Sequence, residues 1–192
     1  PDDAKQKDDQ GNSALHYLCR SGEANAHYVS ILVDAKVEVN CRNDNGRTAL
    51  HSTCAVGRHA IDVTQELLSR RANVNAKDAE GATPLHLICL HAQVDVAQEL
   101  LRCRANVNRK DCKGATALHI LYGLGVGPGK VEMVKELLQF RADRNIKDKQ
   151  GETVLHALCT NSCFPNADYL LQAGSDVNAC NKQKKTPLHS LC

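Results

Sequence analysis

Tryptophan is absent from this chain, and only two Phe and four Tyr occur among its 192 residues. Proteins that bind single-stranded nucleic acid stack the bases on aromatic side chains, and so few aromatics argue against that class. Neither sign of charge dominates, since 24 basic and 22 acidic residues give a formal net charge of +2. A near-neutral chain lacks the positive field typical of nucleic-acid-binding proteins. Nucleic acid is therefore not expected as a partner.

Long apolar runs are also missing. No stretch of about 18 apolar residues occurs, so the sequence predicts no transmembrane helix. The N-terminus shows no signal-peptide pattern, but the chain begins at Pro1 without a Met and stops at Cys192. Because Cys192 falls inside an expected helix, we expect the chain to be a piece of a longer protein.

A short phrase that ends in histidine recurs along the chain. Its clearest copy, Asp78 to His86, reads Asp-Ala-Glu-Gly-Ala-Thr-Pro-Leu-His. The six copies end at His16, His51, His86, His119, His156 and His189, at intervals of 35, 35, 33, 37 and 33 residues. A fixed period in the thirties is typical of stacked supersecondary units, which share one continuous core. The sequence predicts a polar lead-in (1–7) and one repeat domain (8–192), with units at 8–42, 43–77, 78–110, 111–147, 148–180 and a partial unit at 181–192.

Each unit follows the same order of local signals. A turn of the form Asp-x-x-Gly comes first in most units, and glycine supplies the positive φ that the turn needs. A Ser or Thr two residues later is suited to cap a helix, and Pro84 and Pro187 follow where a helix start tolerates proline. A first helix carries the repeated Leu and His, and a second helix carries paired apolar residues. The unit then closes on an Asn.

These motifs resemble the ankyrin repeat family, whose signature Gly-x-Thr-Pro-Leu-His matches Gly81 to His86 at every position. The resemblance extends from about Asp8 to Cys192. It implies an all-α solenoid of stacked helix-loop-helix units with β-turn or hairpin fingers. It also implies that the repeated His bonds the Thr hydroxyl and neighbouring backbone. In that family a concave face of fingertips and inner helices binds another protein.

Five of the 10 cysteines lie three residues after a repeated His: Cys19, Cys54, Cys89, Cys159 and Cys192. This repetition explains them better than the disulfides of a small secreted protein, so we expect an intracellular, reducing location. Two possible ligands per unit fall short of the four that structural zinc needs. The repeated Ser, His and Asp follow the repeat and form no nucleophile, base and orienting group. We therefore expect no metal, no cofactor, no catalytic residue and no enzyme activity.

Basic residues replace a glycine of the family pattern after the second helix of four units. They are Lys36, Arg71, Arg104 and Arg141, whereas Gly174 keeps the pattern. A side chain in the left-handed conformation costs about 1 kcal/mol, and a cation at a helix C-terminus gains about 0.3–1 kcal/mol. One interpretation of these four basic residues is that the conformational cost and the helix-dipole gain nearly cancel. The alternative is a basic stripe that meets an acidic partner or phosphates.

A Gly-rich stretch, residues 123–130, lengthens the fourth unit and ends at Lys130. A phosphate-binding loop needs Gly at position 124 and Ser or Thr at position 131, where Leu124 and Val131 stand. We therefore expect an elongated loop between two helices. A contact with a partner remains open.

The expected binding face combines an apolar centre with a charged rim, as protein interfaces do. We predict its partner-binding residues to be Tyr17, Lys77, Leu87, Leu90, Lys110, Lys113, Ile120 and Lys149. The resemblance also implies asparaginyl hydroxylation, whose loose spacing from a preceding Leu is met at Asn40 and Asn178.

Two functions follow from this interpretation. The first is a protein–protein interaction scaffold that binds a partner protein on the concave face, with no small-molecule substrate. The alternative is a regulatory or substrate-recruiting module of a larger enzyme, channel or ubiquitin-ligase adaptor. The sequence does not identify the partner.

Overall fold

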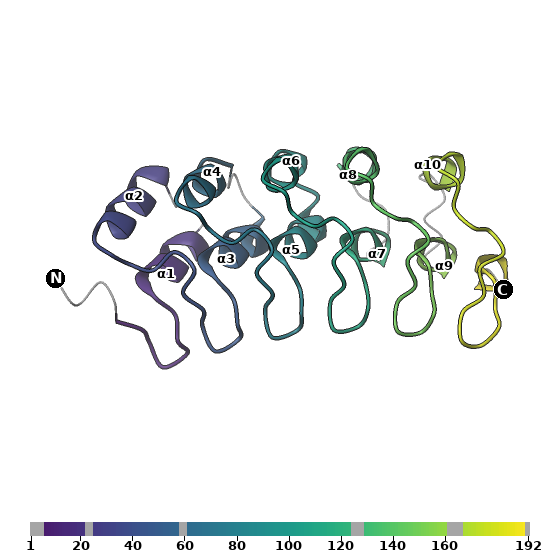
Figure 1. The fold of residues 1–192 in the computed structure, drawn as a ribbon, viewed down its shortest axis with the longest axis horizontal. Helices are drawn as coiled ribbons and strands as arrows, with labels where there is room; N and C mark the ends of the chain where they lie inside the picture. Colours follow the sequence, from purple (N-terminus) through teal and green to yellow (C-terminus); the bar gives the residue numbers. More distant parts are fainter. Residues whose placement is uncertain (1–5, 22–24, 58–60, 124–128, 161–166, 191–192) are drawn as a thin grey trace. The chain divides into compact units, whose positions relative to one another are not determined.

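The computed structural model describes residues 6–21, 25–57, 61–123, 129–160 and 167–190, which form pairs of short helices (Figure 1). The chain divides into two compact units: Pro1–His91 with Asp95–Ala105, and Ala92–Val94 with Asn106–Cys192. None of the described residues lies in a strand, although Lys7 and Ser13 form an isolated bridge. The predicted all-α repeat architecture is confirmed.

The first unit stacks three helix pairs. Its inner helices are α1 (Ala14–Arg20), α3 (Ala49–Val56) and α5 (Pro84–His91), and its outer helices are α2 (Ala26–Asp34), α4 (Ile61–Ser69) and α6 (Val94–Arg102). Helix α3 packs against both α1 and α5, and α2 packs against α4. In Figure 1 the loops that precede the inner helices project away from the outer helices, and we call these loops the fingers.

The second unit repeats this plan. It contains inner helices α7 (Ala117–Gly123) and α9 (Val154–Thr160), outer helices α8 (Lys130–Gln139) and α10 (Ala167–Gln172), and the 3₁₀ helix η3 (Pro187–Ser190). Helix α9 packs against α7, η3 and α10, and α7 also packs against α8. The predicted elongated inter-helix loop falls largely on residues 124–128, which lie outside the described residues.

The core of each unit is built from repeat positions. In the first unit the leucine before each repeated His is buried, as Leu50 is at 1% exposure. Burial of one such leucine stabilises the fold by about 1.5–3 kcal/mol. The small Cys19, Cys54 and Cys89 are buried as well. Burial raises the pKa of Cys19 to about 11 and that of Cys89 to about 12, so these thiols stay protonated.

The basic residues after the outer helices adopt the left-handed conformation, as predicted. Their φ values are 70°, 64°, 65° and 63° at Lys36, Arg71, Arg104 and Arg141. Each helix closes through the residue that follows, since Ala72 N–H donates to Leu67 O at 2.9 Å. Ala92, with φ 52°, is a further left-handed residue that the sequence did not suggest.

Candidate functional site

The fingers are held by hydrogen bonds within and between repeats. Asp78 shows the local pattern, because its Oδ1 accepts from the N–H groups of Glu80 and Ala82 at 3.0 and 2.9 Å. Neighbouring fingers of the first unit are joined where Ala79 N–H donates to Asn45 O at 2.8 Å. In the second unit Lys149 N–H donates to Lys113 O at 2.9 Å. These bonds satisfy much of the backbone, so finger side chains are presented on an ordered framework.

Four of the repeated histidines tie the start of an inner helix to the next finger: His16, His51, His119 and His156. The N–H of Thr48 donates to His51 Nδ1 at 3.2 Å, so Nδ1 must be an acceptor. The proton therefore lies on Nε2, which donates to Ala82 O at 3.2 Å. Burial lowers the pKa of His51, and of the equivalent His16 and His119, below the ordinary value of 6.5. The role implied for this histidine is confirmed, and it leaves no imidazole nitrogen available for metal or catalysis at His51.

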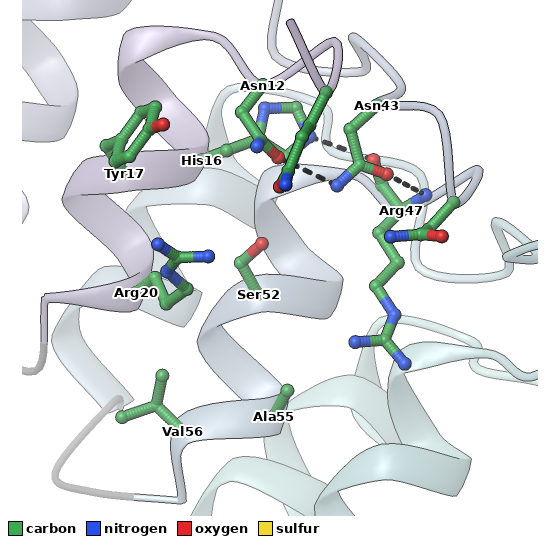
Figure 2. Close-up of a pocket in the computed structure, with 11 residues that line it drawn as sticks. Asn12, His16, Tyr17, Arg20, Asn43, Arg47, Ser52, Ala55 and Val56 are labelled. Carbon is green, nitrogen blue, oxygen red and sulfur yellow. Dashed lines mark hydrogen bonds between the residues drawn. The ribbon is translucent and has the colours of Figure 1, made fainter. Parts of the chain in front are cut away.

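A pocket of about 230 Å³ lies in the first unit, between the first two fingers and helices α1 and α3 (Figure 2). Arg20, Tyr17 and His16 reach it from α1, and Ser52, Ala55 and Val56 reach it from α3. The fingers contribute Gln10, Asn12, Asn43, Asn45 and Arg47. Figure 2 shows the Arg20 and Arg47 side chains on either side of Ser52. The pocket therefore joins two guanidinium groups, amides and a hydroxyl in one place.

Some of these polar groups already have partners. Asn43 Nδ2 donates to Asn12 Oδ1 at 2.8 Å, and Asn43 Oδ1 accepts from Arg47 N–H at 2.9 Å. His16 Nε2 lies 2.8 Å from Arg47 O. These bonds hold the two fingers against α1, and the three side chains form a wall of the pocket (Figure 2).

Tyr17 closes one side of the pocket through contacts that fix its ring. Its hydroxyl donates to Asp8 Oδ2 at 2.5 Å, and the Arg20 guanidinium carbon lies 5.5 Å from the ring centroid. The pKa of Asp8 is held well below its usual range, and this hydrogen bond from Tyr17 is the largest cause. Tyr17 is still 48% exposed, so an ordered aromatic surface faces solvent.

Basic residues at the start of the fingers link consecutive repeats. Lys7 Nζ donates to Arg42 O at 3.1 Å, and Arg42 Nη2 donates to Lys77 O. In the second unit Lys110 Nζ donates to Lys147 O at 2.7 Å, and Lys147 Nζ donates to Cys180 O at 2.8 Å. Sequence reasoning missed this ladder. Its signal was the basic residue that directly precedes the Asp or Asn of most fingers.

The predicted partner-binding residues differ in exposure. Tyr17 and Leu90 are exposed, at 48% and 43%, and Ile120 is half-buried. Exposed Lys110, Lys113 and Lys149 lie in fingers of the second unit, and half-buried Lys77 precedes a finger of the first. Of the eight, only Tyr17 lines the pocket.

The expectation that Leu87 faces solvent is wrong, because Leu87 is only 7% exposed. Pro84 to Cys89 are all buried in α5. A helix that is apolar on every side becomes buried instead of presenting one apolar face to solvent. Leu87 therefore belongs to the core, and Leu90, one turn further on, is the exposed leucine of α5.

The Asn that closes a unit bonds to the next repeat. Asn40 Nδ2 donates to Arg71 O at 3.0 Å, and Asn40 Oδ1 accepts from Asn73 N–H at 2.7 Å. Hydroxylation at Asn40 and Asn178 stays a prediction. At Asn40 the modified residue would be one that is exposed and already bonded to the next repeat through both atoms of its amide.

No group of three or more His, Cys, Asp or Glu within the described ranges is placed to hold a metal ion. The eight described cysteines are free thiols, of which Cys103, Cys112 and Cys180 are exposed. None of the helices within the described residues combines the length and the apolar character needed to cross a bilayer.

Comparison with known proteins agrees with the repeat geometry. The family model described as ankyrin repeats (3 copies) matches residues 1–78, 54–123 and 126–192. A search of curated proteins gave no match.

Proposed function

Because the chain belongs to the ankyrin repeat family, whose repeats are generally protein–protein interaction modules, we propose that it binds a partner protein through its fingers and inner helices. The binding face comprises the finger side chains and the inner-helix residues at the positions of Tyr17 and Arg20. In the family this is the concave face. The chain acts as a scaffold with no chemistry of its own.

The observation that carries this proposal is the pocket of the first unit (Figure 2). Its side chains come from fingers and inner helices together, which is where the family binds. Tyr17 and Arg20 are exposed there, although both are ordered by contacts. Arginine and tyrosine are enriched among residues that dominate binding energy at protein interfaces.

Leu90 extends the same face. It occupies the repeat position of Arg20 and Ala55, both of which line the pocket, and it is 43% exposed. The cation of α1 is thus followed by apolar residues at the equivalent positions of α3 and α5. An apolar anchor near charged groups fits the composition of protein interfaces.

An intracellular location is part of the proposal. Among the described cysteines five are buried free thiols and three are exposed free thiols. Exposed thiols persist where the surroundings are reducing.

Photo-crosslinking from the two sides of one repeat tests the proposed face. A photoreactive residue replaces Leu90 on inner helix α5 or Arg102 on outer helix α6, both exposed, and the chain is irradiated in cell extract. We expect a protein adduct from position 90 that excess unlabelled chain competes away, and none from position 102. Competable adducts from position 102 alone would refute the proposed face.

A further inference from the structure

The pocket of the first unit holds more hydrogen-bond donors than the protein itself uses. Within the described part of the chain, the Arg20 guanidinium makes no hydrogen bond or ion pair, although it lies over the Tyr17 ring. Toward the other described residues the Arg47 side chain uses only Nε, which lies 3.4 Å from Asp78 Oδ2. The Ser52 hydroxyl also has no hydrogen-bond partner among the described residues. Three donor groups from three segments therefore meet at one opening (Figure 2).

Apart from the contact between Arg47 Nε and Asp78 Oδ2, the nearby Asp8 and Asp78 carboxylates do not use these donors. Asp8 accepts from its own finger and from Tyr17, through both of its oxygens. Asp78 accepts from two amides of its own finger through Oδ1 and meets only Arg47 Nε through Oδ2. The terminal nitrogens of Arg47 and the whole of Arg20 remain available to a ligand.

We infer that this pocket receives the side-chain carboxylate of an Asp or Glu of the partner protein, held by Arg20, Arg47 and Ser52. A guanidinium group is planar and presents paired N–H donors that match the two oxygens of a carboxylate. This assignment rests on the proposed function, because it names the partner group that the binding face takes.

The charges around the pocket favour a carboxylate over a phosphate. The two guanidinium groups are accompanied by two carboxylates, Asp8 next to Tyr17 and Asp78 next to Arg47. A phosphate monoester carries about −1.5 to −2 charges at neutral pH, and both carboxylates repel it more than they repel a singly charged group. One carboxylate adds a single negative charge, and its two oxygens can accept about four hydrogen bonds from the free donors.

The remaining wall suits the aliphatic part of an acidic side chain. Ala55 and Val56 line the pocket from α3, and both are half-buried. The Tyr17 ring lies on the α1 side (Figure 2). Methylene groups that precede a carboxylate pack against such surfaces, while the charge reaches the guanidinium groups.

Nuclear magnetic resonance titration of the isotope-labelled chain with blocked tripeptides tests the inference. The probes are acetyl-Ala-Glu-Ala-amide, its Gln counterpart and its phosphoserine counterpart, each followed through the Tyr17 and Ser52 amide signals. We expect the Glu peptide to bind about tenfold more tightly than the Gln peptide, as for a charge-assisted hydrogen bond. It should also bind more tightly than the phosphoserine peptide.

Two variants locate the effect. Arg20→Gln should weaken binding of the Glu peptide about tenfold. Arg102→Gln removes the same charge from outer helix α6, outside the pocket, and should leave binding unchanged. An equal loss in both variants would show a non-specific charge effect and overturn the inference. Equal binding of the Gln peptide, or tighter binding of the phosphoserine peptide, would also overturn it.

This experiment and the crosslinking experiment fail separately. Loss of the carboxylate response while position 90 still crosslinks a partner removes the carboxylate assignment and leaves the proposed function standing. A Glu response in a chain that crosslinks only from position 102 supports the pocket's ligand class and removes the proposed face.

Discussion

Lowering the pH from about 7.5 to about 5.5 is expected to destabilise the folded chain through its buried histidines. The pKa values of His16, His51 and His119 are lowered by burial from 6.5. Between 6.5 and these lower values the unfolded chain binds more protons than the folded chain, so stability rises with pH. The contribution is fully present above 6.5 and is lost as the pH falls toward the folded-state pKa.

The size of the effect follows from the fixed tautomer. When a histidine stays neutral in the folded chain and takes up a proton in the unfolded chain, the free energy of unfolding falls by about 1.4 kcal/mol at one pH unit below 6.5. The three histidines together set an upper limit of about 4 kcal/mol. Lowered carboxyl pKa values, as at Asp8 and Glu66, act at lower pH and do not contribute in this window.

Urea unfolding followed by helical circular dichroism at the two pH values measures this loss. His51→Gln provides the matched control, since it removes one titrating group. We expect the variant to show a pH-dependent loss that is smaller by up to about 1.4 kcal/mol. Unchanged or greater stability of the natural chain at the lower pH would refute the neutral, buried state of these histidines.

Three further predictions concern the framework. Cys54→Ser should lower the free energy of unfolding by about 1–3 kcal/mol more than Cys54→Ala, because Cys54 is 0% exposed and a hydroxyl there has no water partner; chemical denaturation of the two variants compares them. Arg71→Gly should leave the free energy of unfolding unchanged or raise it by up to about 1 kcal/mol, since glycine relieves the backbone strain at φ 64° while the attraction between the cation and the helix dipole is lost. A clear fall in melting temperature would contradict that balance. Gly114→Ala should cost more than about 1 kcal/mol, because its φ is 80° and a Cβ would lie 2.8 Å from Lys149 N. Gly123→Ala, with no atom within 4 Å of the added Cβ, should be neutral or stabilising, as differential scanning calorimetry can show.

The framework was predictable from the sequence because the same local signals repeat in phase. The Ser or Thr before each first helix and the His three residues later form one hydrogen-bonded unit, seen at Thr48 and His51. The left-handed Lys36 and Arg71 followed from the residues that stand where the family has Gly. Such features depend on neighbours in the sequence.

The exposure of individual side chains was less predictable. Tyr17 and Leu87 occupy the same repeat position, directly after the repeated His, but Tyr17 is 48% exposed and Leu87 is 7% exposed. Tyr17 carries a hydroxyl that bonds Asp8 and stays near water, whereas Leu87 lies in a helix that is apolar on every side. Burial therefore depended on the whole helix and not on one repeat position.

The pocket was not predictable, because its arginines occupy unrelated repeat positions. Arg20 ends α1, and Arg47 lies in the next finger. Arg20 lies beyond the repeated phrase and Arg47 stands at its variable position before Thr48, and only the packing of finger against helix brings them to one opening. The free nitrogens of both became apparent once the partners of Asp8 and Asp78 were known.

The central claim is that a protein partner binds the face of fingers and inner helices. Two exposed tyrosines of the first repeat test it most directly: Tyr17 on inner helix α1, 48% exposed, and Tyr28 on outer helix α2, 55% exposed. Affinity for the crosslinked partner is measured by isothermal titration calorimetry with Tyr17→Ala and Tyr28→Ala. We predict that Tyr17→Ala weakens binding by more than about 1 kcal/mol, as a buried aromatic contact would, and that Tyr28→Ala leaves it unchanged. Loss of affinity in Tyr28→Ala with full affinity in Tyr17→Ala would contradict the account.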